Sequence, residues 1–178
     1  VRHFFRAGGA SNTIAKAMSA YDKDYSNSIY GKEEKNRFVT QNRLKKMLKH
    51  EIKLIDERLD NTETPNRRFF SYANTVTTIN YHKTFKGHGW VGIMFQHAPN
   101  GEYSEILIHV RFRENEASLQ QETLGSLGVN LIYGAFNLYD NPRELIKSLY
   151  DDISVDKIEI DTIHFEGPAF PYVDNRLM

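Results

Sequence analysis

The sequence predicts an α+β fold in which a mainly antiparallel sheet of about five strands packs against four helices. Segments with apolar residues at helical spacing lie near both ends of the chain, and segments with alternating apolar residues lie between them. The resulting order, α-α-β-β-β-β-α-α-β, lacks the strict alternation of strand and helix that builds a parallel sheet.

The length of 178 residues is sufficient to bury a core without disulfide or metal staples. We expect one domain over residues 1–178. We also expect that it is a fragment of a longer chain, because the sequence starts at Val1 in an aromatic run and stops at Met178 without a polar tail.

The first part of the chain carries two predicted helices. The first has Ser11 or Asn12 as its N-cap, and a polar connector follows over residues 22–35. The second is a long amphipathic helix that Thr40 caps and that residues 60–61 end. The apolar stripes are Ile14, Ala17, Met18 and Tyr21 in the first helix and Leu44, Met47, Leu48, Ile52, Ile55 and Leu59 in the second.

The middle of the chain predicts strands. Residues 68–73 and 76–82 are rich in aromatic and β-branched residues, which favours two strands. Residues 91–95 and 106–112 alternate between apolar and other positions on either side of an Asn-Gly pair. They therefore predict a β-hairpin with one buried face.

The last part of the chain predicts two helices and one strand. Residues 117–136 have helical spacing, and three glycines within them suggest close packing or a break. An Asn-Pro pair at residues 141–142 is a strong helix start. Residues 157–165 form the last predicted strand, and the apolar phase slips between Ile160 and Ile163, which predicts a β-bulge.

Composition excludes several classes of function. The chain has 23 basic and 23 acidic residues, so its formal net charge is zero, which argues against a nucleic-acid partner. It has no cysteine, which excludes a thiolate zinc site and a cysteine nucleophile. The apolar runs are too short for a membrane-spanning helix, so we expect a cytoplasmic protein without a membrane partner. The histidine spacings match no zinc motif, so we expect no metal site.

The segment from Arg6 to Ser11 is the first candidate site. Gly8 and Gly9 precede a predicted helix, so their backbone amides could converge with that of Ser11 on a phosphate, and Arg6 could neutralise it. The segment matches neither a Walker loop nor G-x-G-x-x-G. The alternative is a flexible turn with an N-cap, which needs no ligand.

His88 is the candidate catalytic residue. It lies between two glycines at the start of a strand, a placement suited to a general acid or base. The alternative is a tight turn with a solvated histidine. His109 and Arg111 share a polar face of the next strand, and both become candidates for an anionic ligand if another part of the protein covers that face. Otherwise the face is simply solvated.

Arg176 is a further candidate phosphate ligand, since it lies in a polar cluster, Asp-Asn-Arg, after an aromatic loop. The same cluster could equally be a connector to the next element.

Three stretches carry a resemblance to a known family: residues 4–11 with 19–23, residues 127–136, and residues 173–178. They resemble the amino-terminal portion of a bacterial family of unassigned activity, and the likeness covers nearly the whole chain. Its members carry automatic names such as nicotinate-nucleotide adenylyltransferase and TonB-dependent receptor. The residues that match the family are Arg6, Gly8, Gly9, Asn130, Tyr133, Asp174, Asn175 and Arg176.

The first of these names implies a cytosolic nucleotide-handling enzyme with a Rossmann-like parallel sheet and an H-x-G-H loop, and the sequence pattern indicates neither. The second name does not suit a segment with four predicted helices.

Two hypotheses of function follow. In the first, the chain is a nucleotide- or phosphate-metabolite-handling enzyme domain, in which nucleotidyl transfer would take Mg²⁺ and a nucleotide or phosphorylated small molecule. In the second, it is a non-catalytic binding or assembly module that supports a missing C-terminal domain, as a homo-oligomer or by docking to the rest of the chain. The Tyr-rich connector and the glycine-bearing helix favour this second hypothesis.

Overall fold

The computed structural model describes residues 1–59, 66–171 and 173, apart from the side chain of Asn36. Residues 1–36 and residues 37–178 form two compact units, and each is described by itself. The expectation of a single domain over residues 1–178 stays a prediction.

The unit of residues 1–36 contains two short helices, α1 (Arg2–Ala7) and α2 (Lys23–Tyr30), and two 3₁₀ turns, Ala10–Asn12 and Glu34–Asn36. The helix predicted from Ile14 to Tyr21 is wrong, because residues 14–21 are not helical. No residue of its apolar stripe is buried, so a helix there would gain little from packing.

The helix forms instead in the predicted connector. Asp22 caps α2 by accepting a hydrogen bond of 2.8 Å from the backbone N–H of Tyr25, and Gly31, with φ of 81°, ends it. These local capping signals outweighed the apolar spacing of the preceding residues.

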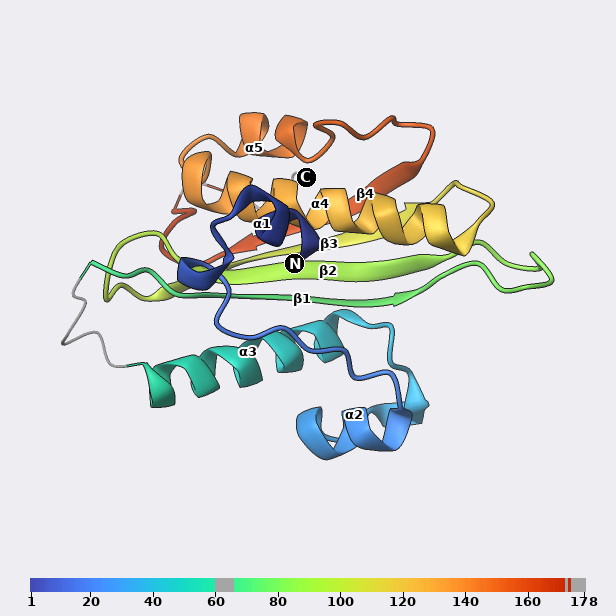
Figure 1. Cartoon of the computed structure of the whole chain (residues 1–178), viewed down its shortest axis with the longest axis horizontal. Coiled ribbons are helices and arrows are strands. Elements are labelled where there is room, and N and C mark those ends of the chain that lie inside the picture. The colour runs from blue at the N-terminus through green and yellow to red at the C-terminus, as the bar shows by residue number, and fades with distance from the viewer. Residues whose placement is uncertain (60–65, 172, 174–178) are drawn as a thin grey trace. The chain divides into compact units, whose positions relative to one another are not determined.

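The unit of residues 37–178 is built on an antiparallel sheet, which confirms the predicted α+β class (Figure 1). Its strands pair in chain order, and the number within the described residues is four, not five. They are β1 (Phe70–Thr77), β2 (His88–Gln96), β3 (Tyr103–Phe112) and β4 (Ile158–Glu166).

The two strands predicted for residues 68–82 are one strand, β1, followed by a loop. The side chain of Asn80 accepts from the backbone N–H of Thr84 and donates to its hydroxyl, at 3.0 and 2.8 Å. This polar turn follows the end of the strand, and Tyr81 within it is 94% exposed.

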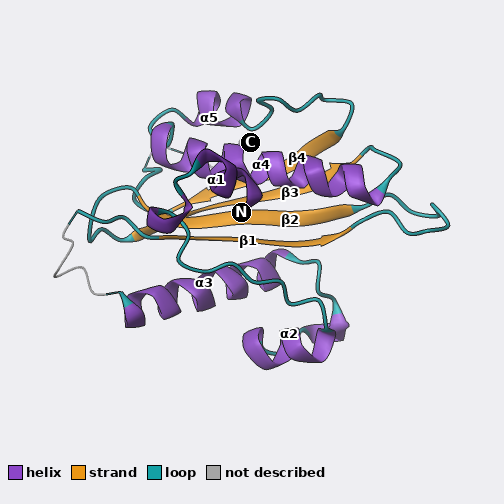
Figure 2. Ribbon diagram, viewed as in Figure 1, coloured by secondary structure: helices purple, strands orange, loops and turns teal. Residues whose placement is uncertain are grey.

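Helices cover both faces of the sheet (Figure 2). Helix α3 (Gln41–Arg58) packs on one face, and α4 (Ala117–Asn137) with α5 (Pro142–Ser148) packs on the other. The predicted caps are confirmed: Thr40 accepts from the N–H of Arg43, and Asn141 accepts from the N–H of Glu144. None of the helices in the described ranges is long and apolar enough to cross a membrane.

The predicted hairpin is confirmed in β2 and β3, but its single buried face is wrong. Val91, Ile93 and Phe95 face α4 and α5, whereas Met94 and Leu107 pack against Leu44, Leu48 and Ile52 of α3. Both sides of these strands are therefore buried where helices cover them.

The predicted bulge in the last strand is confirmed. Along β3 and β4, His109 pairs with Thr162 and Val110 pairs with Ile160, so Asp161 is the extra residue. The N–H of Ile160 donates instead to the hydroxyl of Tyr150, at 3.1 Å. This bond satisfies a backbone group beside the bulge.

The Thr40 cap gives a direct test of how α3 begins. We expect Thr40→Ala to lower the free energy of unfolding by about 1 kcal/mol, because the first turn of α3 loses its side-chain acceptor. Urea denaturation measures the change. Thr40→Ser is the control, since its hydroxyl can still accept from Arg43, and equal losses in both variants would contradict a capping role.

Candidate functional site

The candidate site lies on the sheet face that α3 only partly covers. On β3, alternate residues from Glu105 to Arg111 point to this face. Helix α3 packs over Leu107 and its neighbours on β1 and β2. The groups around His109 and Arg111 form a polar cluster at one end of the face.

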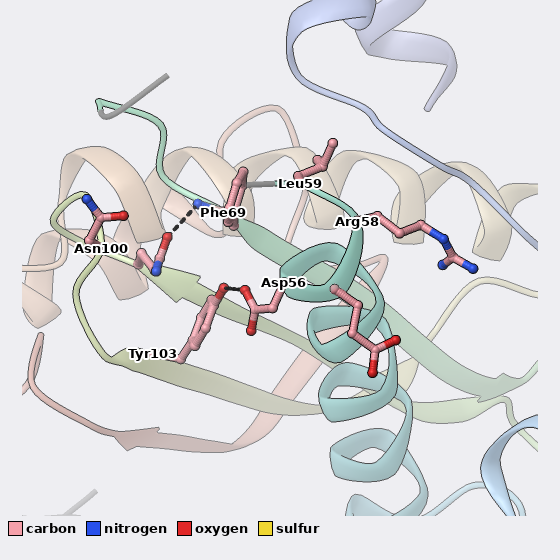
Figure 3. A pocket seen from close by; sticks show the side chains of 8 residues that line it. Asp56, Arg58, Leu59, Phe69, Asn100 and Tyr103 are labelled. Atoms are coloured by element: carbon pink, nitrogen blue, oxygen red, sulfur yellow. Dashed lines mark hydrogen bonds between the residues drawn. The ribbon is translucent and has the colours of Figure 1, made fainter. Parts of the chain in front are cut away.

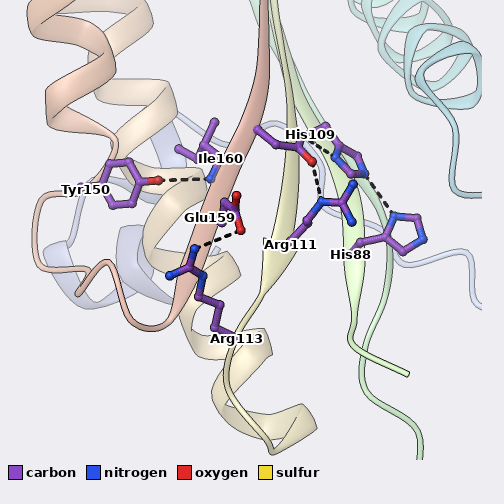
Figure 4. Close-up of polar contacts among 8 residues, drawn as sticks. His88, His109, Arg111, Arg113, Tyr150, Glu159 and Ile160 are labelled. Atoms are coloured by element: carbon purple, nitrogen blue, oxygen red, sulfur yellow. Dashed lines mark hydrogen bonds and ion pairs between the residues drawn. The ribbon is translucent and has the colours of Figure 1, made fainter. Parts of the chain in front are cut away.

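Asp161, in the bulge, joins two residues of β3 (Figure 4). Its Oδ1 accepts from Nδ1 of His109 at 2.7 Å, and its Oδ2 accepts from Nε of Arg111 at 2.6 Å. Nε2 of His109 lies 3.1 Å from Nδ1 of His88 on β2. The three residues Asp161, His109 and His88 thus form a hydrogen-bonded chain, hereafter the Asp-His-His chain.

The direction of these hydrogen bonds follows from the carboxylate, which can only accept. His109 must therefore donate from Nδ1, so in its neutral form Nε2 is an acceptor and Nδ1 of His88 donates to it. This arrangement leaves Nε2 of His88 as an acceptor on the far side of its ring (Figure 4). Trp90, the only tryptophan of the chain, lies against the same pair, with its ring centroid 5.0 Å from that of His109.

The surroundings shift the pKa values of two ionisable groups, His88 and Asp161. Burial lowers the pKa of His88 below its ordinary value, and the nearby charges of His109 and Arg111 add to the effect. Burial alone would raise the pKa of Asp161, but the hydrogen bonds from Arg111 and His109 hold it below its ordinary value. The chain therefore combines an ionised carboxylate with a terminal imidazole that stays neutral near pH 7.

A cavity of about 480 Å³ opens beside His88. Its charged groups are the side chains of Lys86, Arg111, Arg113 and Glu159, so positive charge is in excess. Arg113 donates to Oε2 of Glu159 at 3.0 Å. Arg111 uses Nε for Asp161, and its side chain is 62% exposed. A cavity with this lining suits an anion.

A second polar cluster lies farther along the same face. Oε1 of Glu105 on β3 lies 2.7 Å from Nζ of Lys45, and Oε2 of Glu166 on β4 lies 3.3 Å from it. Nε2 of His164 lies 3.3 Å from the same oxygen of Glu166. Contacts with His164, Glu105 and Lys45 lower the pKa of Glu166 to about 2.

A cavity of about 540 Å³ lies at the other end of β2 (Figure 3). Its polar groups bond to one another: Tyr103 donates to Oδ1 of Asp56 at 2.7 Å, and the amide of Gln96 bonds to the N–H of Phe69 and to the carbonyl of Gly101. Burial and the neighbouring carboxylate of Asp56 raise the pKa of Tyr103. The hydrogen bond between Tyr103 and Asp56 joins the end of α3 to the sheet.

Two of the predicted site residues come together, since His88 and Arg111 are cross-strand partners and line the same cavity. The expectation that His88 opens a strand is confirmed, whereas the alternative of a solvated histidine in a tight turn is not. His88 begins β2 and is half-buried, and a side chain at Gly89 would overlap Val76 of β1. Close packing of the strands therefore explains the glycine that follows it.

The predicted phosphate loop belongs to the unit of residues 1–36. Arg6 lies in the last turn of α1, and Gly8, with φ of 79°, ends that helix. The loop therefore follows a helix C-terminus, and the helix expected after Gly9 and Ser11 is replaced by a single 3₁₀ turn. The dipole argument for phosphate binding there does not apply, and binding at these residues stays a prediction. Arg176 lies outside the described residues.

Two of the three glycines of the predicted assembly helix, Gly128 and Gly134, pack within their own unit. Gly128 lies against the ring of Tyr72, whose hydroxyl has a pKa raised to about 12 by burial, and Gly134 lies against Leu145. Asn130, a residue of the family resemblance, donates to the carbonyls of Leu149 and Asp151. These contacts explain the presence of Gly128, Gly134 and Asn130 without a second copy of the chain.

Sequence reasoning missed Asp161 and the cluster of Glu105, His164 and Glu166. The phase slip that predicted the bulge already marked Asp161. His164 and Glu166 are two residues apart, so they share a strand face, but the opposing position of Glu105 depends on a register that the sequence does not state.

Comparison of the chain with protein-family models, with curated proteins and with solved structures finds no match.

The charges around His88 predict how its imidazole titrates. We expect a pKa below 6.5 by NMR, lowered further in Asp161→Asn, which removes a negative charge that favours the imidazolium. We expect Arg111→Gln to raise it, because a positive charge is lost. The far-UV circular dichroism spectrum is the control and should be the same in all three proteins. One common midpoint for His88 would contradict the described geometry.

Proposed function

We propose that residues 37–178 bind a phosphorylated small molecule, such as a nucleotide, in the cavity beside His88, and that His88 acts on it as a general base. The observation that carries the proposal is that the Asp-His-His chain ends at a cavity lined by Lys86, Arg111 and Arg113. Such a cavity pairs anion-binding groups with a group that can accept a proton.

The cationic groups would hold the phosphate. Guanidinium groups bind phosphate oxygens through paired hydrogen bonds, and Lys86 would add a point charge. Arg111 is held by Asp161 and Arg113 by Glu159, so both guanidinium groups are oriented before a ligand binds. Orientation of this kind lowers the entropic cost of binding.

The Asp-His-His chain would move the proton. Nε2 of His88 would take a proton from an attacking hydroxyl, whose oxygen forms a bond to phosphorus as the bond to the leaving group breaks. The Nδ1 proton of His88 could then pass to Nε2 of His109, where the positive charge is stabilised by Asp161. The lowered pKa of His88 suits this role, because a base must be unprotonated at working pH.

Phosphoryl or nucleotidyl transfer is the reaction class that these groups favour, because positioning and charge supply most of its catalysis. Nucleotidyl transfer would take Mg²⁺ together with the phosphates of the substrate. The internal packing of Gly128 and Gly134 in α4 supports an enzyme over an assembly module, since these two glycines do not require a second copy of the chain.

Thermal unfolding of the 178-residue chain with ATP, nicotinate mononucleotide or inorganic phosphate tests the proposal. At 100 times Kd a ligand adds about 2.7 kcal/mol, which raises Tm by several degrees at this size. We expect Arg111→Gln and Arg113→Gln each to weaken binding about 10- to 100-fold, as the loss of a charged hydrogen bond does. His88→Gln should keep binding but lose turnover.

The control is Lys147→Gln, a 65% exposed residue of α5 that pairs only locally, with Glu144 among the described contacts. It should leave the ligand-induced shift unchanged. A shift that survives both arginine variants but disappears in Arg6→Ala would contradict the proposal and assign binding to the loop of residues 6–11.

A further inference from the structure

The cluster of Glu105, His164 and Glu166 has a charge imbalance that points to a cation. Glu105 and Glu166 are direct cross-strand partners, so their like charges face each other. Lys45 supplies one positive charge against two negative ones. The pair therefore keeps a net negative charge that a divalent ion would balance.

Glu105 is the buried member of the cluster. Its side chain is only 8% exposed, and its Oε1 makes no hydrogen bond within the described part of the chain, although Nζ of Lys45 lies 2.7 Å away. A buried carboxylate oxygen without an aligned donor is costly, and the carboxylate of Glu105 also has an oxygen within 4.8 Å of ligand atoms of His164 and Glu166. This buried oxygen points to a cation independently of the number of acidic residues in the cluster.

The spacing of the donor atoms suits one metal ion. One atom from each of Glu105, His164 and Glu166 lies within 4.8 Å of the others. Nε2 of His164 and Oε2 of Glu166 are 3.3 Å apart. Two ligands bound at about 2.1 Å have this separation when they subtend an angle between about 90° and 110°, as in tetrahedral or octahedral sites.

We propose that Glu105, His164 and Glu166 bind a divalent first-row transition metal ion such as Zn²⁺, in place of the ammonium of Lys45. One imidazole and two carboxylates are donors that Zn²⁺ and its neighbours accept, whereas Mg²⁺ prefers oxygen alone. The His164 and Glu166 side chains are 30% and 60% exposed, so the site is open to solvent. Three protein ligands leave a coordination position for water.

Lys45 occupies the place that the metal ion would take, and it therefore provides a direct test of the proposal. Its side chain comes from α3, is 31% exposed and can swing into solvent, so its ammonium competes with the metal for the two carboxylates. Lys45→Met should therefore lower Tm without metal, because Glu105 loses its counter-charge. The same variant should bind Zn²⁺ at least about tenfold more tightly, because a nearby positive charge is gone.

Isothermal titration of the 178-residue chain with Zn²⁺, together with thermal unfolding, provides the test. We expect one saturable site, a larger Zn²⁺-induced rise in Tm in Lys45→Met, and binding weakened by roughly 10- to 100-fold or more in His164→Ala. Visible absorption of bound Co²⁺ reports the coordination geometry of the site, and its change in His164→Ala reports the imidazole ligand without any activity assay.

His82→Ala is the matched control, because His82 is an exposed histidine of the loop after β1. It should leave Zn²⁺ binding unchanged. Equal weakening in His82→Ala and His164→Ala, no saturable binding, or no gain of affinity in Lys45→Met would each overturn the proposal. None of these results depends on the ligand of the His88 cavity.

Discussion

Strand β3 is paired along both edges and packed on both faces, and the rest of the unit of residues 37–178 depends on that constraint. Its residues Ile106, Leu107, Ile108 and Val110 have no exposed surface. With both edges paired to β2 and β4, its backbone cannot shift without breaking two ladders. Side chains on such a strand are held more tightly than side chains on loops.

Both polar clusters have side chains on β3, so these side chains are held in place by the strand. Both use residues of β3, His109 and Arg111 in the first cluster and Glu105 in the second, and both include a carboxylate from β4. His109 and Glu105 lie four positions apart in extended chain, which is about 13 Å along the strand. The clusters are therefore distinct sites on one polar surface.

Much of the unit of residues 37–178 was predictable because local signals agreed with packing. Helix α3 forms as predicted because its stripe of Leu44, Leu48 and Ile52 meets a sheet face, and its Thr40 cap fixes the start. The stripe from Ile14 to Tyr21 had the same spacing but no buried contact, so the capping residue Asp22 placed the helix later.

The site was only partly predictable. His109 and Arg111 could be placed on one face from strand alternation. The position of His88 beside them depends on the pairing of β2 with β3, and their partner Asp161 depends on a bulge that turns one residue out of phase. The second cluster depends on which residues of β3 and β4 oppose each other. That register is set by long-range pairing of strands, and it cannot be predicted from a single sequence.

The position of Trp90 has a practical consequence. Because the chain has no other tryptophan and this indole lies against His109, its fluorescence comes from one place, beside the Asp-His-His chain. A protonated imidazole quenches indole emission more than a neutral one does. The unlabelled protein therefore carries its own optical reporter of the charge on that chain, readable in a cuvette at micromolar concentration.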